Sequence, residues 1–143
     1  MITIDSCGKV KVNQNQTNQR ELIISNISEQ DKQLYNIVGN ILKDINITPE
    51  LKGYNYLREA IIMVYKDSSY KSGMMERLIP EIAEKFNEKN VINVYRDIRT
   101  AIYKANKMTC EEILYKYFKK IPVKRKLSPN KAIIALVKYI NLD

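Results

Sequence analysis

Apolar residues recur every three or four positions through most of the chain after Asp31, and this period constrains the fold more than any other feature. The period is that of an α-helix with one buried face. It predicts helices over residues 31–46, 54–67, 72–79, 80–86, 91–107, 110–118 and 129–141, with Pro80 either kinking the third helix or starting a new one. We therefore expect an all-α fold, a bundle of about six helices.

Several local signals refine this expectation. Gly53 is expected to end the turn before the second helix in the left-handed conformation. Thr109 and Glu112 have the spacing of a capping box for the helix over 110–118. Ile37 and Tyr65 belong to the apolar stripes of the first two helices, so we expect both to face inward.

The first 30 residues differ from the rest. Short apolar pairs flank residues 6–9 and predict a small β-hairpin, and residues 13–19, NQNQTNQ, form a polar tract that cannot build a core. We therefore expect a short, non-helical, polar N-terminal arm over residues 1–30 and one helical domain over residues 31–143.

The formal net charge is +8, and it is unevenly distributed. Residues 1–34 hold four basic and four acidic side chains, whereas residues 35–143 hold 20 basic and 12 acidic ones. The densest basic run is residues 116–126, which contain no acid. A basic excess of this kind concentrates polyanions around a domain, and nucleic acid is the usual partner. A solvated surface explains the run equally well, so charge alone leaves both interpretations open.

The composition gives little support for catalysis. The chain has no His, and its two cysteines, Cys7 and Cys110, lack metal-ligand spacing, so we expect two free thiols, no metal and no cofactor. Its four glycines are scattered and form no phosphate-binding loop. We therefore expect no enzyme. Because no run reaches about 20 apolar residues and no signal peptide is visible, we expect a cytoplasmic protein with no membrane partner.

Residues 80–86 and 91–107 have the pattern of a helix-turn-helix, in which the second helix reads DNA. The residues predicted to contact DNA are Lys89, Asn93, Tyr95, Arg96, Arg99 and Lys104, with Lys124, Arg125 and Lys126 from the basic run. Arg96 suits a bidentate contact to guanine, Asn93 suits adenine, and Tyr95 suits a thymine methyl group or a phosphate. The other six cations are predicted to contact phosphates. An ordinary surface helix with solvated arginines is the alternative.

Three stretches carry a family resemblance: residues 51–65, LKGYNYLREAIIMVY, 79–87, IPEIAEKFN, and 98–102, IRTAI. They resemble the C-terminal DNA-binding effector domain of the master response regulator that initiates sporulation in endospore-forming bacteria. The resemblance covers about residues 35–142, and its first stretch is the most specific. It implies an all-α bundle of about six helices with a helix-turn-helix. It also implies binding to short boxes upstream of promoters, often as head-to-tail pairs, to activate or repress transcription.

The chain departs from this family in two ways. The family protein carries a phosphorylated receiver domain, whereas only the unrelated arm of residues 1–30 precedes the similar part here, so we expect no phosphorylation control. The family's recognition helix presents an R-x-E-R pattern to the bases. With one residue inserted in the preceding turn, the matching stretch here is Asn93-Val94-Tyr95-Arg96, which retains only the last arginine, and Arg99 matches a family arginine one turn further on.

The predicted function is therefore sequence-specific binding of double-stranded DNA by a transcriptional regulator. The resemblance leaves two further kinds of interaction open. The domain could assemble on DNA as a homodimer or tandem pair, and it could contact RNA polymerase or a sporulation regulator. The alternative is a protein-interaction module that has lost specific DNA reading and modulates the full-length regulator or the transcription machinery.

The N-terminal arm is predicted to be dispensable for folding. Deleting residues 1–30 should leave the helical circular dichroism and cooperative melting of residues 31–143 nearly intact, because the arm has no helical apolar stripe. Thermal melts of the full and shortened chains measure this. Loss of cooperative melting after the deletion would show that the arm belongs to the core or to an obligate dimer.

Overall fold

The structure is a computed structural model that describes residues 28–119 and 127–141. The predicted hairpin and polar tract, and the predicted contacts Lys124, Arg125 and Lys126, lie outside these residues. The described helices are α2 (Glu29–Asp44), α3 (Gly53–Lys66), η1 (Ser68–Ser72), η2 (Met74–Leu78), α4 (Ile79–Lys85), α5 (Val91–Met108), α6 (Glu111–Phe118) and α7 (Pro129–Asn141). Within this part of the chain there is no strand, and the all-α prediction is confirmed.

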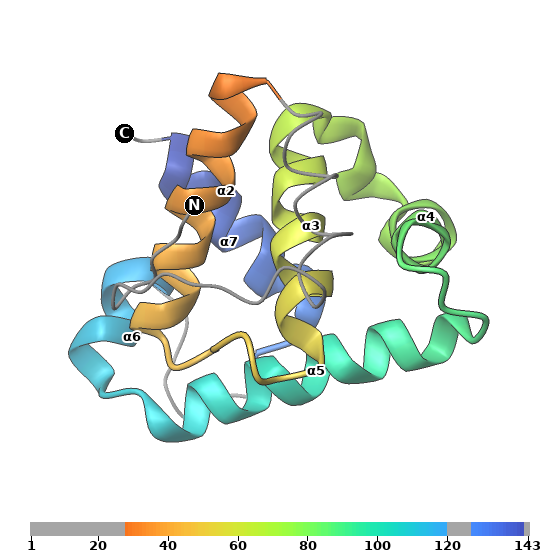
Figure 1. The fold of residues 1–143 in the computed structure, drawn as a ribbon. Helices are drawn as coiled ribbons and strands as arrows, with labels where there is room; N and C mark the ends of the chain where they lie inside the picture. The colour runs from red at the N-terminus through yellow and green to blue at the C-terminus, as the bar shows by residue number, and fades with distance from the viewer. Residues whose placement is uncertain (1–27, 120–126, 142–143) are drawn as a thin grey trace, which may run out of the picture. The chain divides into compact units, whose positions relative to one another are not determined.

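The chain divides after Leu34 into two units, and the packing described below is that of residues 35–143. α3 is the central helix of this unit and packs against α4, α5 and α7 (Figure 1). Leu57 and Ile61 of α3 are fully buried, as the periodicity predicts. The five residues of α7 predicted to face inward are also buried: Ala132, Ile133, Leu136, Val137 and Ile140.

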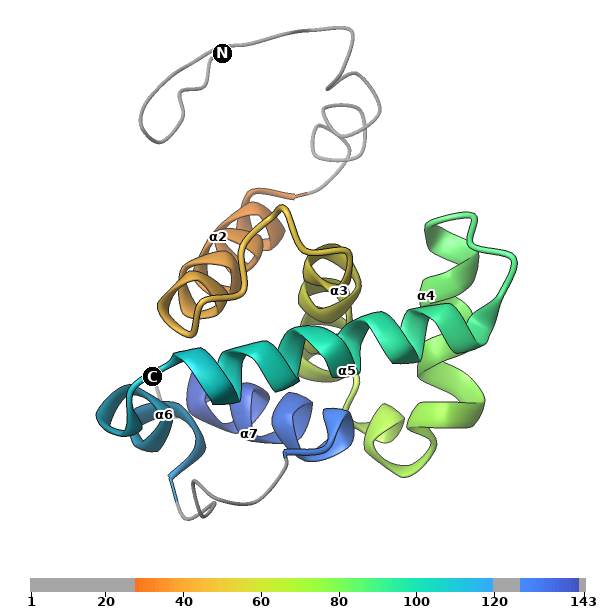
Figure 2. The same ribbon diagram turned by 90° about the horizontal axis from the view of Figure 1, so that it is seen from below.

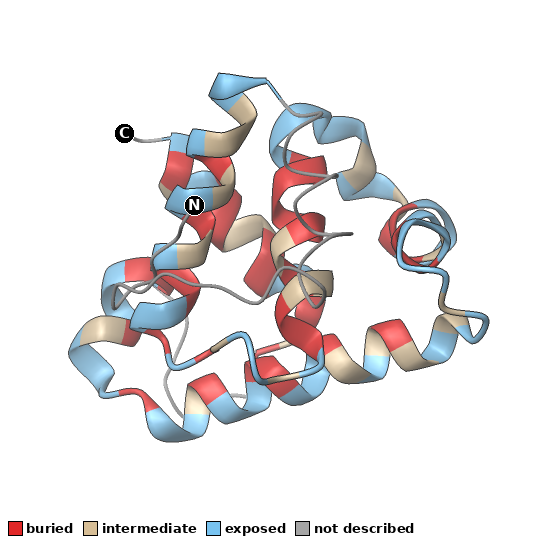
Figure 3. Cartoon of the chain, in the orientation of Figure 1, coloured by how far each residue is buried: buried red, intermediate tan, exposed pale blue. Residues whose placement is uncertain are grey.

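Each buried Leu, Ile or Val side chain of this kind contributes about 1.5 to 3 kcal/mol relative to exposure. The shared face of α3, α5 and α7 is therefore the main stabilising feature of the unit. Figure 3 shows buried residues on the side of α5 that faces α3 and exposed residues on its opposite side. α5 thus lies across the end of the bundle, and no described helix covers its opposite face (Figure 2).

Gly53 was predicted to end the preceding turn, but in the structure it begins α3. A Cβ atom at Gly53 would overlap the backbone carbonyl of Asp97 in α5. The reason for a glycine here is therefore the close approach of two helices and not a left-handed backbone. This contact brings the start of α3 directly onto the backbone of α5.

The predicted capping box at Thr109 is also wrong. The Thr109 hydroxyl donates a 2.9 Å hydrogen bond to the Ile45 carbonyl and accepts a 3.0 Å bond from the Asn46 side chain. The cap residue of α6 is Cys110, which makes no side-chain capping bond. Thr109 is buried, so its hydroxyl satisfies polar groups between the end of α5 and the end of α2 instead of serving α6.

The connection between α3 and α4 differs from the single helix predicted over 72–79. The 3-10 helix η1 is followed by the π-helical turn η2, which runs directly into α4. η2 buries Met74 and Leu78. Pro80 stands in the first turn of α4, where the missing N–H has no intrahelical partner to lose, so it begins this helix instead of kinking an earlier one.

Two residues predicted to face inward are partly exposed. Ile37 is 45 % exposed and Tyr65 is 39 % exposed. Ile37 lies at the edge of the apolar stripe of α2, and Tyr65 lies in the last turn of α3 beside the exposed Lys66 and Asp67. Periodicity identifies the apolar stripe of a helix, but it does not distinguish the partly exposed residues at the edge of the stripe from the buried residues at its centre. In the part of the chain that the structure describes, no helix combines the length and apolar character needed to cross a membrane.

Gly53→Ala is expected to lower the free energy of unfolding by about 1 to 3 kcal/mol, because the added methyl group forces α3 and α5 apart. In a helix, alanine normally raises the free energy of unfolding by up to about 1 kcal/mol relative to glycine. A decrease in Gly53→Ala would therefore be opposite to the effect of helix propensity. Gly73→Ala is the control, since a Cβ atom there meets only the flexible Arg77 side chain, at 3.1 Å. Urea unfolding of both variants measures the difference, and equal small effects would contradict the close contact.

Candidate nucleic-acid interface

α4 and α5 are joined by a tight turn that sets them across one another (Figure 1). Asn87 adopts a left-handed backbone with φ 56°. Its N–H donates to the Glu84 carbonyl at 3.1 Å, and the Glu88 N–H donates to the Ala83 carbonyl at 2.8 Å. This pair of bonds is the Schellman motif that ends α4, and Asn is one of the few side chains that tolerates the left-handed position. Helix, turn and helix therefore follow as the sequence predicts.

The Glu88 side chain connects this turn to the first turn of α5. Its carboxylate accepts the Asn90 N–H at 3.1 Å and the Asn93 side-chain amide at 3.2 Å. These hydrogen bonds, with smaller contributions from the Tyr56 phenol and the Arg96 charge, hold the pKa of Glu88 below its ordinary value. The ionised carboxylate thus fixes the start of α5.

α4 is held against the central helix by a buried carboxylate. Glu59 of α3 is 5 % exposed, and it accepts hydrogen bonds from the Tyr35 hydroxyl at 2.6 Å and from the Lys85 ammonium group at 2.5 Å. A buried carboxylate needs such partners, because desolvation of an unpaired charge is costly. The pairing ties α2, α3 and α4 together. The Phe86 ring also packs edge-on against Tyr56, with ring centroids 5.4 Å apart.

α5 has one buried and one exposed face. Its N-cap is Asn90, whose side-chain oxygen accepts the Ile92 N–H at 3.0 Å. The buried face consists of Val94, Ile98, Ala101, Ile102 and Ala105. On the other side, at about 100° per residue, five exposed side chains fall within about 80° of arc. We call these the outer face of α5: Ile92, Arg96, Arg99, Tyr103 and Lys107.

The outer face is uncovered and basic. Figure 2 looks onto α5 and shows no other described element in front of it. The Arg96 side chain is 60 % exposed, and its contact with Asp97 is long, at 3.9 Å. An exposed ion pair of this kind contributes at most about 1 kcal/mol, so Arg96 is free to turn toward an external anion. The Lys107 ammonium group lies 6.0 Å from the Tyr103 ring centroid and keeps its charge exposed.

The structure brings together only some of the residues predicted to contact DNA. Arg96 and Arg99 share the outer face, and Lys104 is exposed on one flank of it. Lys89 is exposed in the turn before α5. These four cations surround the first four turns of the helix. Among the described residues, no group of His, Cys, Asp or Glu is arranged to hold a metal ion.

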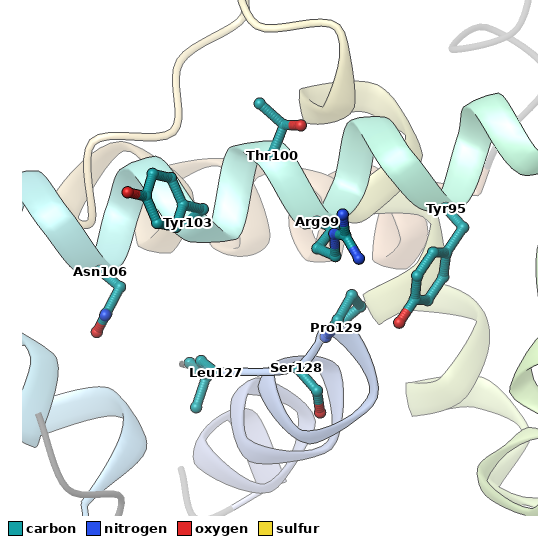
Figure 4. A pocket seen from close by; sticks show the side chains of 8 residues that line it. All are labelled: Tyr95, Arg99, Thr100, Tyr103, Asn106, Leu127, Ser128 and Pro129. Carbon is teal, nitrogen blue, oxygen red and sulfur yellow. The ribbon is translucent and has the colours of Figure 1, made fainter. Parts of the chain in front are cut away.

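Asn93 and Tyr95 lie on opposite flanks of the outer face. Both are partly buried, and the Asn93 side-chain amide donates a hydrogen bond to Glu88. Tyr95 points into a groove of about 520 Å³ between α5 and the start of α7 (Figure 4). The groove is lined by Tyr95, Arg99, Thr100, Tyr103, Asn106, Leu127, Ser128 and Pro129. Arg99 therefore belongs both to the outer face and to the edge of this groove.

Sequence reasoning missed two prominent side chains of the outer face. Ile92 is 71 % exposed and Tyr103 is 51 % exposed. Ile92 stands four residues before Arg96, and Tyr103 stands seven after it, so helical spacing from Arg96 would have found both. The prediction chose the cations and the residues Asn93 and Tyr95 near Arg96, and not the uncharged residues that share its face.

The bond between Glu88 and Asn93 predicts a measurable titration. Asn93→Ala should raise the Glu88 pKa toward its ordinary value, because it removes one of the donors that stabilise the carboxylate. Since that pKa is lowered by folding, the stabilisation from Glu88 is present above the unfolded pKa and is lost as pH falls through the folded one. Carbon-detected NMR of the carboxyl group measures the shift, with the exposed Asn36→Ala on α2 as control. Identical Glu88 titrations in all three proteins would contradict the assigned bond.

One comparison with known proteins bears on this site. The model of the family described as sporulation initiation factor Spo0A C terminal matches residues 38–140. The match spans α3, α4, α5 and α6 and nearly all of α7, so it includes the helix-turn-helix and the helices that support it. The resemblance seen in the sequence is thereby confirmed. The chain belongs to the family of Spo0A C-terminal domains, the DNA-binding effector domains of a transcription regulator.

Proposed function

We propose that this domain binds double-stranded DNA sequence-specifically, with the outer face of α5 in the major groove. The observation that carries the proposal is Arg96, which stands in the middle of this uncovered face. An α-helix fits the major groove, and the N-terminal part of a recognition helix contacts base edges. Arg96 lies in the second turn of α5, where its guanidinium can donate two hydrogen bonds to a guanine.

Phosphate contacts are proposed for the cations around the outer face. Lys89 precedes the helix, Arg99 borders the groove beside α7, and Lys104 lies on the opposite flank. A helix in the major groove runs between two phosphate backbones, so cations on both flanks suit it. From the sequence alone, the run of Lys124, Arg125 and Lys126 is proposed to add to these contacts.

Asn93 and Tyr95 have more restricted roles in the proposal. The Asn93 side-chain amide donates a hydrogen bond to Glu88. To read an adenine, Asn93 has to break this hydrogen bond and form hydrogen bonds to the base instead. Tyr95 faces the groove beside Ser128 and Pro129 (Figure 4). Its phenol is therefore better placed for a phosphate than for a base edge.

The second candidate function is that of a protein-interaction module, and two exposed side chains favour it. Met108 at the end of α5 is 64 % exposed, and Tyr115 on α6 is 65 % exposed. Large apolar side chains of this kind are common in protein interfaces. In this alternative the domain modulates RNA polymerase or the full-length sporulation regulator. Electrophoretic shifts with random and genomic DNA at two salt concentrations separate the two functions. Non-specific binding weakens with salt to the same extent for both DNAs, whereas a sequence-specific domain keeps a preference for genomic fragments that contain its site.

Arg96→Ala should weaken binding to a selected DNA site by about 1 to 3 kcal/mol, while random duplex loses much less, because a guanine contact carries sequence information. The measurement is a binding-site selection with the wild-type domain, followed by titrations of the selected and random duplexes. Lys138→Ala is the matched control, since this exposed cation lies in the last turn of α7, away from α5 (Figure 1).

Two results would contradict the proposal. If the wild-type domain enriches no motif, sequence-specific reading is absent and the interaction module becomes the better account. If Arg96→Ala weakens selected and random duplexes equally, Arg96 contacts a phosphate and another residue reads the bases.

A further inference from the structure

We propose that Ile92 reads the C5 methyl group of a thymine in the major groove, within about two base pairs of the one that Arg96 contacts. The inference rests on the proposed function and specifies part of the DNA target. It gives a role to an apolar side chain that neither charge nor the family's R-x-E-R pattern points to.

Exposure and position together single out Ile92. At 71 % it has the highest exposed fraction among the large apolar side chains of the described residues. Isolated apolar residues are common on protein surfaces, so exposure alone decides nothing. Ile92, however, is the second residue of α5 and belongs to the outer face, where helix-turn-helix proteins place the side chains that contact bases.

The spacing between Ile92 and Arg96 corresponds to about two base-pair steps. Four residues of α-helix turn through about 40° beyond one full turn and rise about 6 Å. Successive base pairs are about 3.4 Å apart. Both side chains therefore meet the same groove within about two base pairs of each other, with Ile92 nearer the start of the helix.

The backbone of Ile92 is held in place before DNA arrives. Its N–H donates a 3.0 Å hydrogen bond to the Asn90 side chain, and the Asn90 N–H donates to Glu88. A β-branched side chain also has few rotamers in a helix, so little conformational freedom is lost on contact. A side chain ordered in this way suits a small, shallow target such as one methyl group.

The thymine methyl is the apolar group that a base pair displays in the major groove, and it distinguishes thymine from cytosine. Burying one methyl-sized group contributes roughly a fourfold gain in affinity. Tyr95, the residue to which the sequence first assigned this contact, faces the groove beside α7 instead (Figure 4). Ile92 is thus the apolar side chain on the part of the outer face nearest the bases.

The test removes the methyl group and the side chain separately. A site is first selected with the wild-type domain, and each thymine in it is then replaced, one at a time, by deoxyuridine, which pairs identically but lacks the methyl group. Wild type should lose about fourfold in affinity at one position near the Arg96 base pair. Ile92→Ala should bind the thymine and deoxyuridine duplexes equally at that position, and Ile92→Val should retain the difference.

Met108→Ala is the matched control, because it removes an exposed apolar side chain from the other end of the same helix. It should respond to deoxyuridine as wild type does. Unchanged melting temperatures would show that the variants remain folded. Three results would overturn the inference while leaving specific binding intact. They are a selected site without thymine at these positions, no deoxyuridine effect in wild type, and an undiminished effect in Ile92→Ala. A selection that yields no motif would overturn both the inference and the proposed function.

Discussion

The missing side chain at Gly53 sets the distance between α3 and α5, and the rest of the unit is arranged around this contact. Because the start of α3 rests on the backbone at Asp97, the apolar face of α5 can pack onto the core through Val94 and Ile98. α7 packs against both helices and closes the core from another side. With one face of α5 buried, its opposite face is exposed among the described residues, and Arg99 and Tyr103 also border the groove beside α7. A structural constraint at one residue therefore defines the surface proposed to meet DNA.

Polar interactions then hold the start of α5. Glu59 is buried and stabilised by Tyr35 and Lys85, so α4 is attached to α3 through a carboxylate whose desolvation is offset by two hydrogen bonds. Glu88 extends this support into α5 by accepting hydrogen bonds from Asn90 and Asn93. A recognition helix gains from such support, because side chains already held in position lose less freedom on binding.

Sequence alone predicted α2, α3, α5, α6 and α7 well, since each of these helices buries one side and periodicity reports burial directly. It did not predict η1, which buries no residue, or the π-helical turn η2. It failed where the deciding partner is distant in the chain. Thr109 looked like a cap because its partners, Ile45 and Asn46, are more than sixty residues away. Gly53 looked like a turn residue because the backbone that it contacts belongs to α5. The candidate site was predicted as a helix with Arg96, Asn93 and Tyr95 facing the bases and cations facing phosphates. The structure places Arg96 in the middle of the outer face and Asn93 and Tyr95 on its flanks, and it adds Ile92 to that face.

The most direct test of DNA binding through the outer face of α5 is an NMR map of the domain with a duplex recovered by binding-site selection. The largest amide shift changes on adding DNA should lie on α5 from Ile92 to Lys107 and in the turn before it, with little change in α2. Changes centred on α6 with the outer face of α5 unaffected would contradict this mode of binding, because the surface that binds DNA would then be a different one.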